Sequence, residues 1–503
     1  MVVFLGIDAG TTSLKAALFD MTGRALAVDL QEYQLKTPAP SWVELEAEVY
    51  WQVCCRAIRN VLSRANIEGR QVAALAISSQ GETLIPVDAD GQPTRPAIVW
   101  LDNRATDAAE WISSAFDARV LHHTTGQVAV TPTWPACKIL WMRRHEPDVF
   151  ARSVRFLLLE DYLLYRLTGR FVTERCLQTS SLLLDIQSGT WWEPMLRETG
   201  ITSEQLGELM DPGEVVGPLS ADGAKATGLA QSTVAVCGGM DVAVGAIGAG
   251  NTTPGMITET TGSVLAELAT LERPLFDPER RAPCHYHALA GRYCLLPWGQ
   301  TAGMALRWFR DQFFGLECRV AEGVGIDGYD IMTGLAAQVP AGCDGLVVLP
   351  HLEGAACPEF NPAARAVFFG ATLRHTRGHF VRAILEAVAY MLKRHVDIIE
   401  DLGVTVSEVS SLGGGARSVL WLQIKADVLQ KPVVVVPGEE VACLGAALMA
   451  AVATGAFSSL EEGVRQMVRR GETVHPREEH RLAYQKGYAT YIELYERLAP
   501  MFR

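Results

Sequence analysis

The sequence predicts an α/β fold that is divided into two large domains. Short apolar runs typical of buried strands alternate along the chain with longer segments of helical periodicity. The chain has 503 residues, more than one typical domain contains. A strand–turn–strand pattern at the start returns in the middle of the chain, which indicates an internal duplication.

The stretch 2–20, VVFLGIDAGTTSLKAALFD, holds the most informative pattern. An apolar run of strand type ends at Asp8, residues 9–13 form a turn of small and hydroxyl residues, and a second apolar run contains Lys15. A carboxylate at a strand end beside a Gly-Thr-Thr turn can organise Mg²⁺ and phosphate oxygens. An ordinary hairpin with a hydrophilic turn is the alternative, and this stretch alone leaves both readings open.

The first half continues with alternating elements, and the strand ends near residues 80 and 102 carry polar groups, where α/β folds place ligands. The region from 133 to 200 is mostly helical. The expected elements are a helix at 47–65, strands at 72–78, 84–87 and 97–100, helical segments from 138 and at 156–167, a strand at 234–237, and a small-residue helix at 242–249.

The best linker signal is Gly248 to Gly255, GAGNTTPG, so we place the boundary there and predict domains 1–250 and 251–503. The uncharged but Ala- and Gly-rich stretch after residue 441 predicts a buried helix rather than a membrane span. The second half is expected to contain strand–turn–strand at 256–268, a strand-to-helix segment at 297–309, strands at 346–350, 406–412 and 433–436, and helices at 379–402 and 441–454.

The composition excludes several classes of function. A formal net charge of −13 argues against a nucleic-acid or anionic-membrane surface, although backbone N–H groups could still bind a nucleotide. The 11 cysteines include no C-x-x-C pair, which predicts free thiols in a reducing cytoplasm rather than zinc ligands or disulfides. The N-terminus lacks the basic region of a signal peptide, so we expect a cytoplasmic protein.

Common ligand motifs are absent or out of context. No Gly-Lys dipeptide exists, so there is no Walker A loop, and the single G-x-G-x-x-G at 323–328 follows no strand and predicts a surface loop. His285 and His287 lack a third metal ligand, which favours packing or surface roles. What remains is a set of Gly/Thr turns at strand ends, 10–13, 260–263 and 413–416, which together with strand-end carboxylates predicts a cleft that holds a polyphosphate and a polar substrate.

A series of motifs extends over nearly the whole chain. In order they are DAGTTSLK (8–15), Gln80 with Glu82, IVWLDNR (98–104), WPACKILWMRRH (134–145), GGMDVAVGAIGAG (238–250), TTGS (260–263), AVFFGATLRHTRGHFVRAILE (366–386), LGGGARS (412–418) and LGAAL (444–448). With these motifs the chain resembles the FGGY carbohydrate kinases, of the actin-like ATPase superfamily, and within that family it is similar to xylulokinases and related ketose kinases. The resemblance implies two ribonuclease H-like domains, each a mixed sheet flanked by helices, with a cleft between them. The first would bind the sugar and carry one phosphate loop, and the second would bind the nucleotide.

The resemblance also implies transfer of the ATP γ-phosphoryl group to a sugar hydroxyl, with ATP and Mg²⁺ as cofactors. Asp241 would be the general base, because a positioned carboxylate can accept the hydroxyl proton, and Asp8 would organise Mg²⁺. The other expected contacts are Gly10, Thr11, Thr12 and Lys15 with the transferred phosphate; Thr261 and Gly262 with the phosphates from the second domain; Gly303, Gly414, Gly415 and Ala416 with the nucleotide; and Gln80, Gly81, Glu82, Asp102, Trp134 and Asp241 with the substrate.

The substrate itself stays open at this stage. Gly81 stands where glycerol kinases carry an arginine, whereas xylulokinases usually have Met-His in place of Gly81-Glu82. Thr133 and Ala371 also depart from the usual family pattern. D-Xylulose is our first expectation, followed by L-ribulose, L-xylulose, erythritol and glycerol. A non-kinase actin-like ATPase or a sugar-binding regulator is the alternative, and the presence of both Asp8 and Asp241 counts against it; a homodimer is an expectation from the family.

Overall fold

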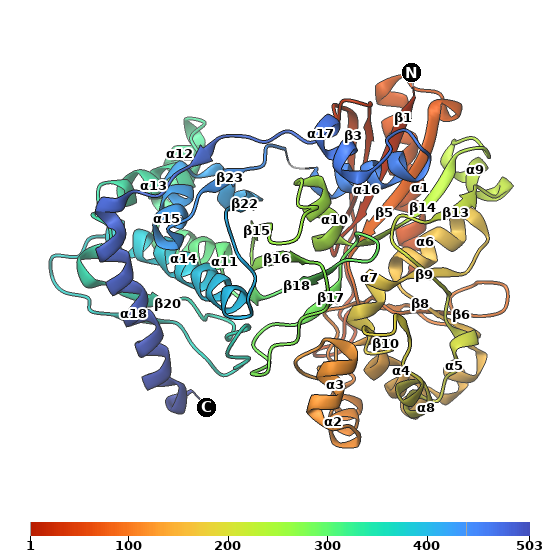
Figure 1. Ribbon diagram of the computed structural model, residues 1–503, viewed down its shortest axis with the longest axis horizontal. Coiled ribbons are helices and arrows are strands. Elements are labelled where there is room, and N and C mark those ends of the chain that lie inside the picture. Colours follow the sequence, from red (N-terminus) through yellow and green to blue (C-terminus); the bar gives the residue numbers. More distant parts are fainter. Residues whose placement is uncertain (1, 439, 503) are drawn as a thin grey trace.

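The computed structural model describes residues 2–438 and 440–502 and contains two main mixed sheets flanked by helices (Figure 1). The first sheet lies in the first half of the sequence. Its strands, in spatial order, are β13 (Val215–Pro218), β14 (Val234–Met240), β5 (Val72–Ser79), β1 (Val3–Ala9), β2 (Ser13–Phe19) and β3 (Ala25–Glu32). Strands β14, β5 and β1 are parallel neighbours, and β2 returns antiparallel to β1.

The second sheet is formed by the second half of the sequence. Its strands, in spatial order, are β17 (Cys284–Tyr286), β18 (Tyr293–Leu295), β16 (Leu265–Leu271), β15 (Ile257–Thr261), β22 (Val409–Leu412), β23 (Val433–Val435) and β24 (Thr473–Val474), with β19 (Trp298–Gly299) paired to β16. Short two-stranded ladders join β4 (Glu44–Leu45) to β7 (Ala97–Ile98), β6 (Ile85–Val87) to β8 (Arg155–Leu157), β9 (Val172–Glu174) to β12 (Glu208–Met210), β10 (Leu184–Asp185) to β11 (Thr190–Trp191), and β20 (Val347–Leu349) to β21 (Val367–Phe369).

The two sheets repeat the same strand order. In the first, the hairpin β1–β2 has β5 parallel to β1, and in the second the hairpin β15–β16 has β22 parallel to β15. The repeat extends to single residues. Asp8 is the partner of Lys15 and Ser78, and Glu259 is the partner of Glu267 and Ser411. The internal duplication predicted from the strand–turn–strand pattern is therefore present in the fold.

The helices cover both sheets. In the first half they are α1 (Ala47–Ala65), α2 (Thr106–Ala115), α3 (Ala118–Thr125), α4 (Pro135–His145), α5 (Pro147–Arg152), α6 (Leu159–Thr168), α7 (Arg175–Gln178), α8 (Glu193–Thr199), α9 (Ala221–Thr227) and α10 (Asp241–Gly248). In the second half they are α11 (Gly303–Phe313), α12 (Gly315–Gly323), α13 (Gly328–Ala337), α14 (Arg377–Asp401), α15 (Val419–Leu429), α16 (Val441–Ala453), α17 (Leu460–Met467) and α18 (Arg481–Leu498).

One helix of the second half packs on the first sheet. Figure 1 shows α16 and α17, in blue, beside β1 and β3, whereas α18 returns to the other half. The approach of α16 needs glycine, because a Cβ at Gly6 would lie 1.8 Å from the Cys443 carbonyl oxygen and one at Gly445 would lie 2.0 Å from that of Val244. A helix from the end of the chain therefore packs on the sheet formed by the first half of the sequence.

One predicted element differs from the structure, whereas the predicted burial of a later helix and the predicted free thiols agree with it. The segment 156–167 was expected to be one helical segment, but it begins in strand β8 and continues as α6, which ends before Gly169 at φ +78°. Leu158, between the two, has extended dihedrals, so the apolar run FLLL serves two elements. Helix α16 is buried as predicted, and within the described residues no helix is long and apolar enough to cross a bilayer. All 11 cysteines are free thiols.

Candidate active site

Three neighbouring strand ends bring together the polar residues of the first half. Strands β1, β5 and β14 are parallel, so their carboxyl ends meet at one edge of the sheet. Asp8 lies near the end of β1, Gln80 and Glu82 follow β5, and Asp241 follows β14 as the first residue of α10. Residues far apart in the sequence thus form one acidic site.

The carboxylates of this site act on one another. Burial, the charge of Asp8 and the charge of Glu82 raise the pKa of Asp241 to about 7, opposed by a hydrogen bond from the Val242 N–H at 2.7 Å. Burial likewise raises the pKa of Glu82 and that of Asp8. A carboxylate with a pKa near neutrality is suited to accept a proton from an alcohol.

Asp8 has the surroundings of a cation-binding carboxylate. Its Oδ1 accepts a hydrogen bond from the Ser78 hydroxyl at 3.1 Å, and burial is the largest influence on its raised pKa. Lys15 faces it across the hairpin and forms an ion pair of 3.1 Å with Glu440. A buried carboxylate oxygen is the ligand type that Mg²⁺ takes in proteins, so these residues fit the ion.

The turn after β1 is held by aromatic side chains. The Tyr33 hydroxyl donates to the Gly10 carbonyl, and the Trp100 indole N–H donates to the Thr11 hydroxyl at 2.8 Å. The Gly10 N–H donates to the Ser13 carbonyl at 3.0 Å, which closes the turn. Thr12 is exposed at its tip. Thr11 and Thr12 are thus on a braced turn beside Asp8.

A pocket of about 620 Å³ lies at the corresponding strand ends of the second sheet. Its size is typical of a small-molecule site. Gly303 at the start of α11 approaches the turn so closely that a Cβ there would lie 2.3 Å from the Gly262 carbonyl oxygen, and a Cβ at Gly415 would lie 2.6 Å from the Thr261 Cβ. The sequence-predicted residues Thr261, Gly262, Gly303, Gly414 and Gly415 all line this pocket. Ala416 lies in the same 3₁₀ turn, Gly414–Arg417.

The Thr261 hydroxyl is bonded within the protein. It donates to Glu259 at 2.7 Å and accepts from the Lys425 ammonium at 2.8 Å, and Lys425 also pairs with Glu259 at 2.6 Å. The side chains of Lys425 and Glu259 are both 0% exposed. The hydroxyl is therefore engaged below the turn, and a phosphate would meet the backbone of this residue instead.

The Asp102 carboxylate is bonded within the protein. It is 0% exposed and forms two hydrogen bonds with the Arg104 guanidinium, at 2.9 and 2.7 Å. The backbone N–H groups of Arg104 and Val43 donate to the same carboxylate. Both oxygens thus have protein partners, and the substrate contact expected of Asp102 stays a prediction.

The remaining substrate candidates lie at the end of β5 and the start of α4. Gln80 is 3% exposed, and its side-chain carbonyl Oε1 is buried without a hydrogen-bond partner among the described residues. Such an acceptor is costly unless a ligand or water satisfies it. Trp134 caps α4, and its indole N–H donates to the Ala129 carbonyl at 3.0 Å. Gly81 is buried directly before Glu82.

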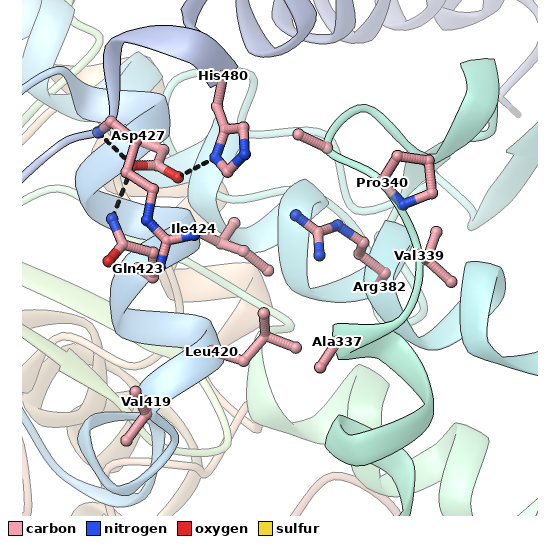
Figure 2. A pocket seen from close by; sticks show the side chains of 12 residues that line it. Ala337, Val339, Pro340, Arg382, Val419, Leu420, Gln423, Ile424, Asp427 and His480 are labelled. Atoms are coloured by element: carbon pink, nitrogen blue, oxygen red, sulfur yellow. Dashed lines mark hydrogen bonds and ion pairs between the residues drawn. The ribbon is translucent and has the colours of Figure 1, made fainter.

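Another pocket, of about 490 Å³, adjoins the pocket of about 620 Å³ described above (Figure 2). The two pockets share Val419 and Leu420 in the first turn of α15. Figure 2 shows Asp427 bonded to Gln423 and His480, at 2.8 and 2.7 Å. The polar groups of this second pocket thus already bond to one another, and it contains none of the residues predicted from the sequence.

Sequence reasoning missed part of the larger pocket. Tyr329, Asp330 and Trp421 line it, and so does Asp327 at the end of the G-x-G-x-x-G loop between α12 and α13. Only their proximity in the fold identifies them. His285 and His287 are buried, and burial lowers their pKa values to about 4 and about 3, as the packing interpretation predicts. Among the described residues, no cluster of three metal-ligating side chains is present.

Comparison with known proteins assigns most of the chain. Residues 3–248 match the N-terminal domain of the FGGY family of carbohydrate kinases, and residues 260–454 match its C-terminal domain. The chain is 31% identical to a xylulose kinase of Escherichia coli over 99% of its length and 100% of the relative, and 30% identical to a gluconokinase of Bacillus subtilis over 91% and 88%. A solved xylulose kinase from Rhodospirillum rubrum superposes with a TM-score of 0.91 at 29% identity, covering 99% of each chain.

Proposed function

The chain belongs to the FGGY family of carbohydrate kinases, which use ATP to phosphorylate an alcohol group, and from that premise we propose that its acceptor is a ketopentose, D-xylulose first. The observation that carries the proposal is the position of Asp241. It stands at a strand end beside two other carboxylates, with a pKa raised to about 7.

Asp241 acts as the general base in this proposal. It takes the proton of the attacking hydroxyl, and positioned base catalysis of this kind contributes about 10²–10⁴-fold. Gln80 and Glu82 accept hydrogen bonds from other hydroxyls of the sugar, and the unpartnered Gln80 Oε1 supports that role. Trp134 and Gly81 bound the same space. These contacts orient the hydroxyl for in-line attack.

The two duplicated turns would hold the phosphates between them. Asp8 would hold Mg²⁺, which when bound would supply positive charge to the phosphate oxygens. Gly10, Thr11, Thr12 and Lys15 contact the transferred phosphate, while Gly262 and the Thr261 backbone contact the others. Gly303, Gly414, Gly415 and Ala416 are small residues that leave room for the nucleotide beside the larger pocket. A Cβ at Gly303 or Gly415 would also collide with the neighbouring turn.

The identity of the sugar rests on the relatives and on the charged groups near the acidic site. The proteins similar to this chain include xylulose kinases, gluconokinases and autoinducer-2 kinases at about 30% identity. The cations in this region already have roles: Lys15 pairs with Glu440 and is assigned to the phosphate, Arg104 pairs with Asp102, and the Lys138 ammonium donates to the Glu82 and Val99 carbonyls. An uncharged ketose or polyol therefore suits this site better than a sugar acid. L-Ribulose, L-xylulose, erythritol and glycerol follow D-xylulose.

A coupled ADP-release screen tests the proposal. The purified protein is assayed with Mg²⁺, ATP and single acceptors: D-xylulose, L-xylulose, L-ribulose, erythritol, glycerol and gluconate. We expect the highest kcat/KM with D-xylulose. A higher kcat/KM with gluconate would contradict the proposed acceptor class, and turnover with none of these acceptors would contradict the assignment to ketoses and polyols.

A further inference from the structure

Glu82 has an unusual backbone conformation for a charged residue in an active site. Its φ is +55°, in the left-handed region that residues with a side chain seldom adopt. The Thr83 N–H donates to the Gly81 carbonyl at 2.7 Å, which makes the turn tight. Such conformations persist only where surrounding contacts impose them. The question is which contacts hold this turn.

A buried lysine from another element holds the backbone of the turn. Lys138, on α4, is 0% exposed, and its ammonium donates to the Glu82 carbonyl at 2.7 Å and to the Val99 carbonyl at 3.1 Å. Burial lowers the pKa of Lys138 to about 7, opposed chiefly by the charge of Glu82. A buried ammonium is costly unless it is well bonded, so its contacts with this turn are structurally significant.

A buried serine lies beside the same turn. Ser180, in the 3₁₀ turn Thr179–Ser181, is 0% exposed, and its hydroxyl donates to the Leu177 carbonyl at 3.0 Å. Its hydroxyl also lies near the Glu82 carboxylate and opposes the rise in the pKa of that group that burial causes. The same hydroxyl limits residue 81, because a Cβ at Gly81 would lie 2.9 Å from the Ser180 Oγ. A side chain at residue 81 would therefore require the Ser180 hydroxyl to move.

We propose that Lys138 and Ser180 position Glu82, Lys138 through the backbone carbonyl and Ser180 through the hydroxyl that lies against residue 81 of the same turn, so that Glu82 meets the acceptor hydroxyls beside Asp241. Both are positioning residues that do not touch the reacting atoms. The inference rests on the proposed function, in which Glu82 faces the sugar. It also explains why this chain carries no side chain at 81: Ser180 occupies that space and leaves Glu82 as the residue that recognises a hydroxyl.

The test compares two fully buried lysines. Lys138→Met and Ser180→Ala should each raise the sugar KM at least about tenfold, as expected when a buried hydrogen bond is lost, with the ATP KM changed less than about twofold. Lys425→Met is the matched control, because Lys425 is equally buried but lies beneath the nucleotide pocket. It should raise the ATP KM instead. In Lys138→Arg, the sugar KM should lie between the value of Lys138→Met and that of the wild type.

Separate results identify which claim fails. If wild type phosphorylates the sugar but folded Lys138→Met and Ser180→Ala keep its KM, the positioning inference is overturned. If Lys138→Met does not fold, Ser180→Ala decides alone. If wild type turns over no acceptor, the proposed function fails, and amide hydrogen exchange at Thr83 still tests the inference: faster exchange in Lys138→Met supports it, and unchanged exchange overturns it.

Discussion

Glu259 faces Ser411 across β15 and β22 in the register in which Asp8 faces Ser78 across β1 and β5. In both pairs the serine hydroxyl donates to the carboxylate. The difference is the counter-ion. Lys425 neutralises Glu259 from within the fold, at 2.6 Å, whereas the lysine opposite Asp8 pairs with Glu440 at 3.1 Å. One duplicated acid is thus part of the core, and the other is suited to an exchangeable cation.

Asp8→Asn should impair Mg²⁺-dependent turnover more than sugar binding, because an amide binds Mg²⁺ weakly while the sugar contacts stay in place. The measurements are kcat as a function of Mg²⁺ concentration and the sugar Kd by calorimetry. An equal loss of both would contradict the division of labour between Asp8 and the sugar-binding residues.

Activity should rise with pH through about 7. Asp241 works as a base only when it is ionised, and its pKa is raised to about 7, so kcat/KM at subsaturating substrates should fall as the pH drops below that value. The charge of Glu82 contributes to this raised pKa. The residual activity of Glu82→Gln should therefore have its acidic limb at lower pH. An acidic limb at the same or a higher pH than in the wild type would refute the influence of the Glu82 charge on the pKa of Asp241.

Gly415→Ala should weaken ATP binding and spare sugar binding. The added Cβ would lie 2.6 Å from the Thr261 Cβ at the wall of the pocket, and overpacking of this kind typically costs about 1–3 kcal/mol. We expect an increase in the ATP KM of about tenfold or more. Gly334→Ala, on α13 with nothing within 4 Å of its Cβ, is the control. Equal ATP KM values for the two variants would disprove the assignment of the pocket wall.

Gly6→Ala should destabilise the fold, because its Cβ would lie 1.8 Å from the Cys443 carbonyl where α16 crosses β1. Denaturant unfolding should show a loss of at least about 1–3 kcal/mol. Gly245→Ala, on α10 with open space around its Cβ, should be neutral or slightly stabilising. A Gly6→Ala protein as stable as wild type would mean that α16 does not pack this closely.

The sequence predicted the residues whose chemistry is carried by local pattern. Asp8 and Asp241 follow apolar runs of strand type, and the turn after residue 413 is rich in glycine, so the sequence predicts their positions at strand ends, where the structure has them. Lys138 was missed because nothing in WPACKILW marks a lysine that bonds to carbonyls some 39 and 56 residues away. The sequence also does not indicate that Asp102 bonds to Arg104, because a carboxylate after a strand has the same local pattern whether it faces a ligand or an arginine.

The local sequence pattern also does not predict where the end of the chain packs. Helix α16 was predicted, but an Ala- and Gly-rich helix can pack on either sheet. The close contact of Gly6 joins α16 to the first sheet, and those of Gly248 and Gly445 join α16 to α10; these contacts are evident only in three dimensions.

The central claim is that Asp241 is the base of a sugar kinase. The most direct test is sugar-dependent ADP release by Asp241→Ala with the best acceptor of the screen, alongside ATP binding by calorimetry. We expect kcat to fall by about 10²–10⁴-fold while ATP still binds with the wild-type Kd. Undiminished phosphorylation in this variant would contradict the mechanism.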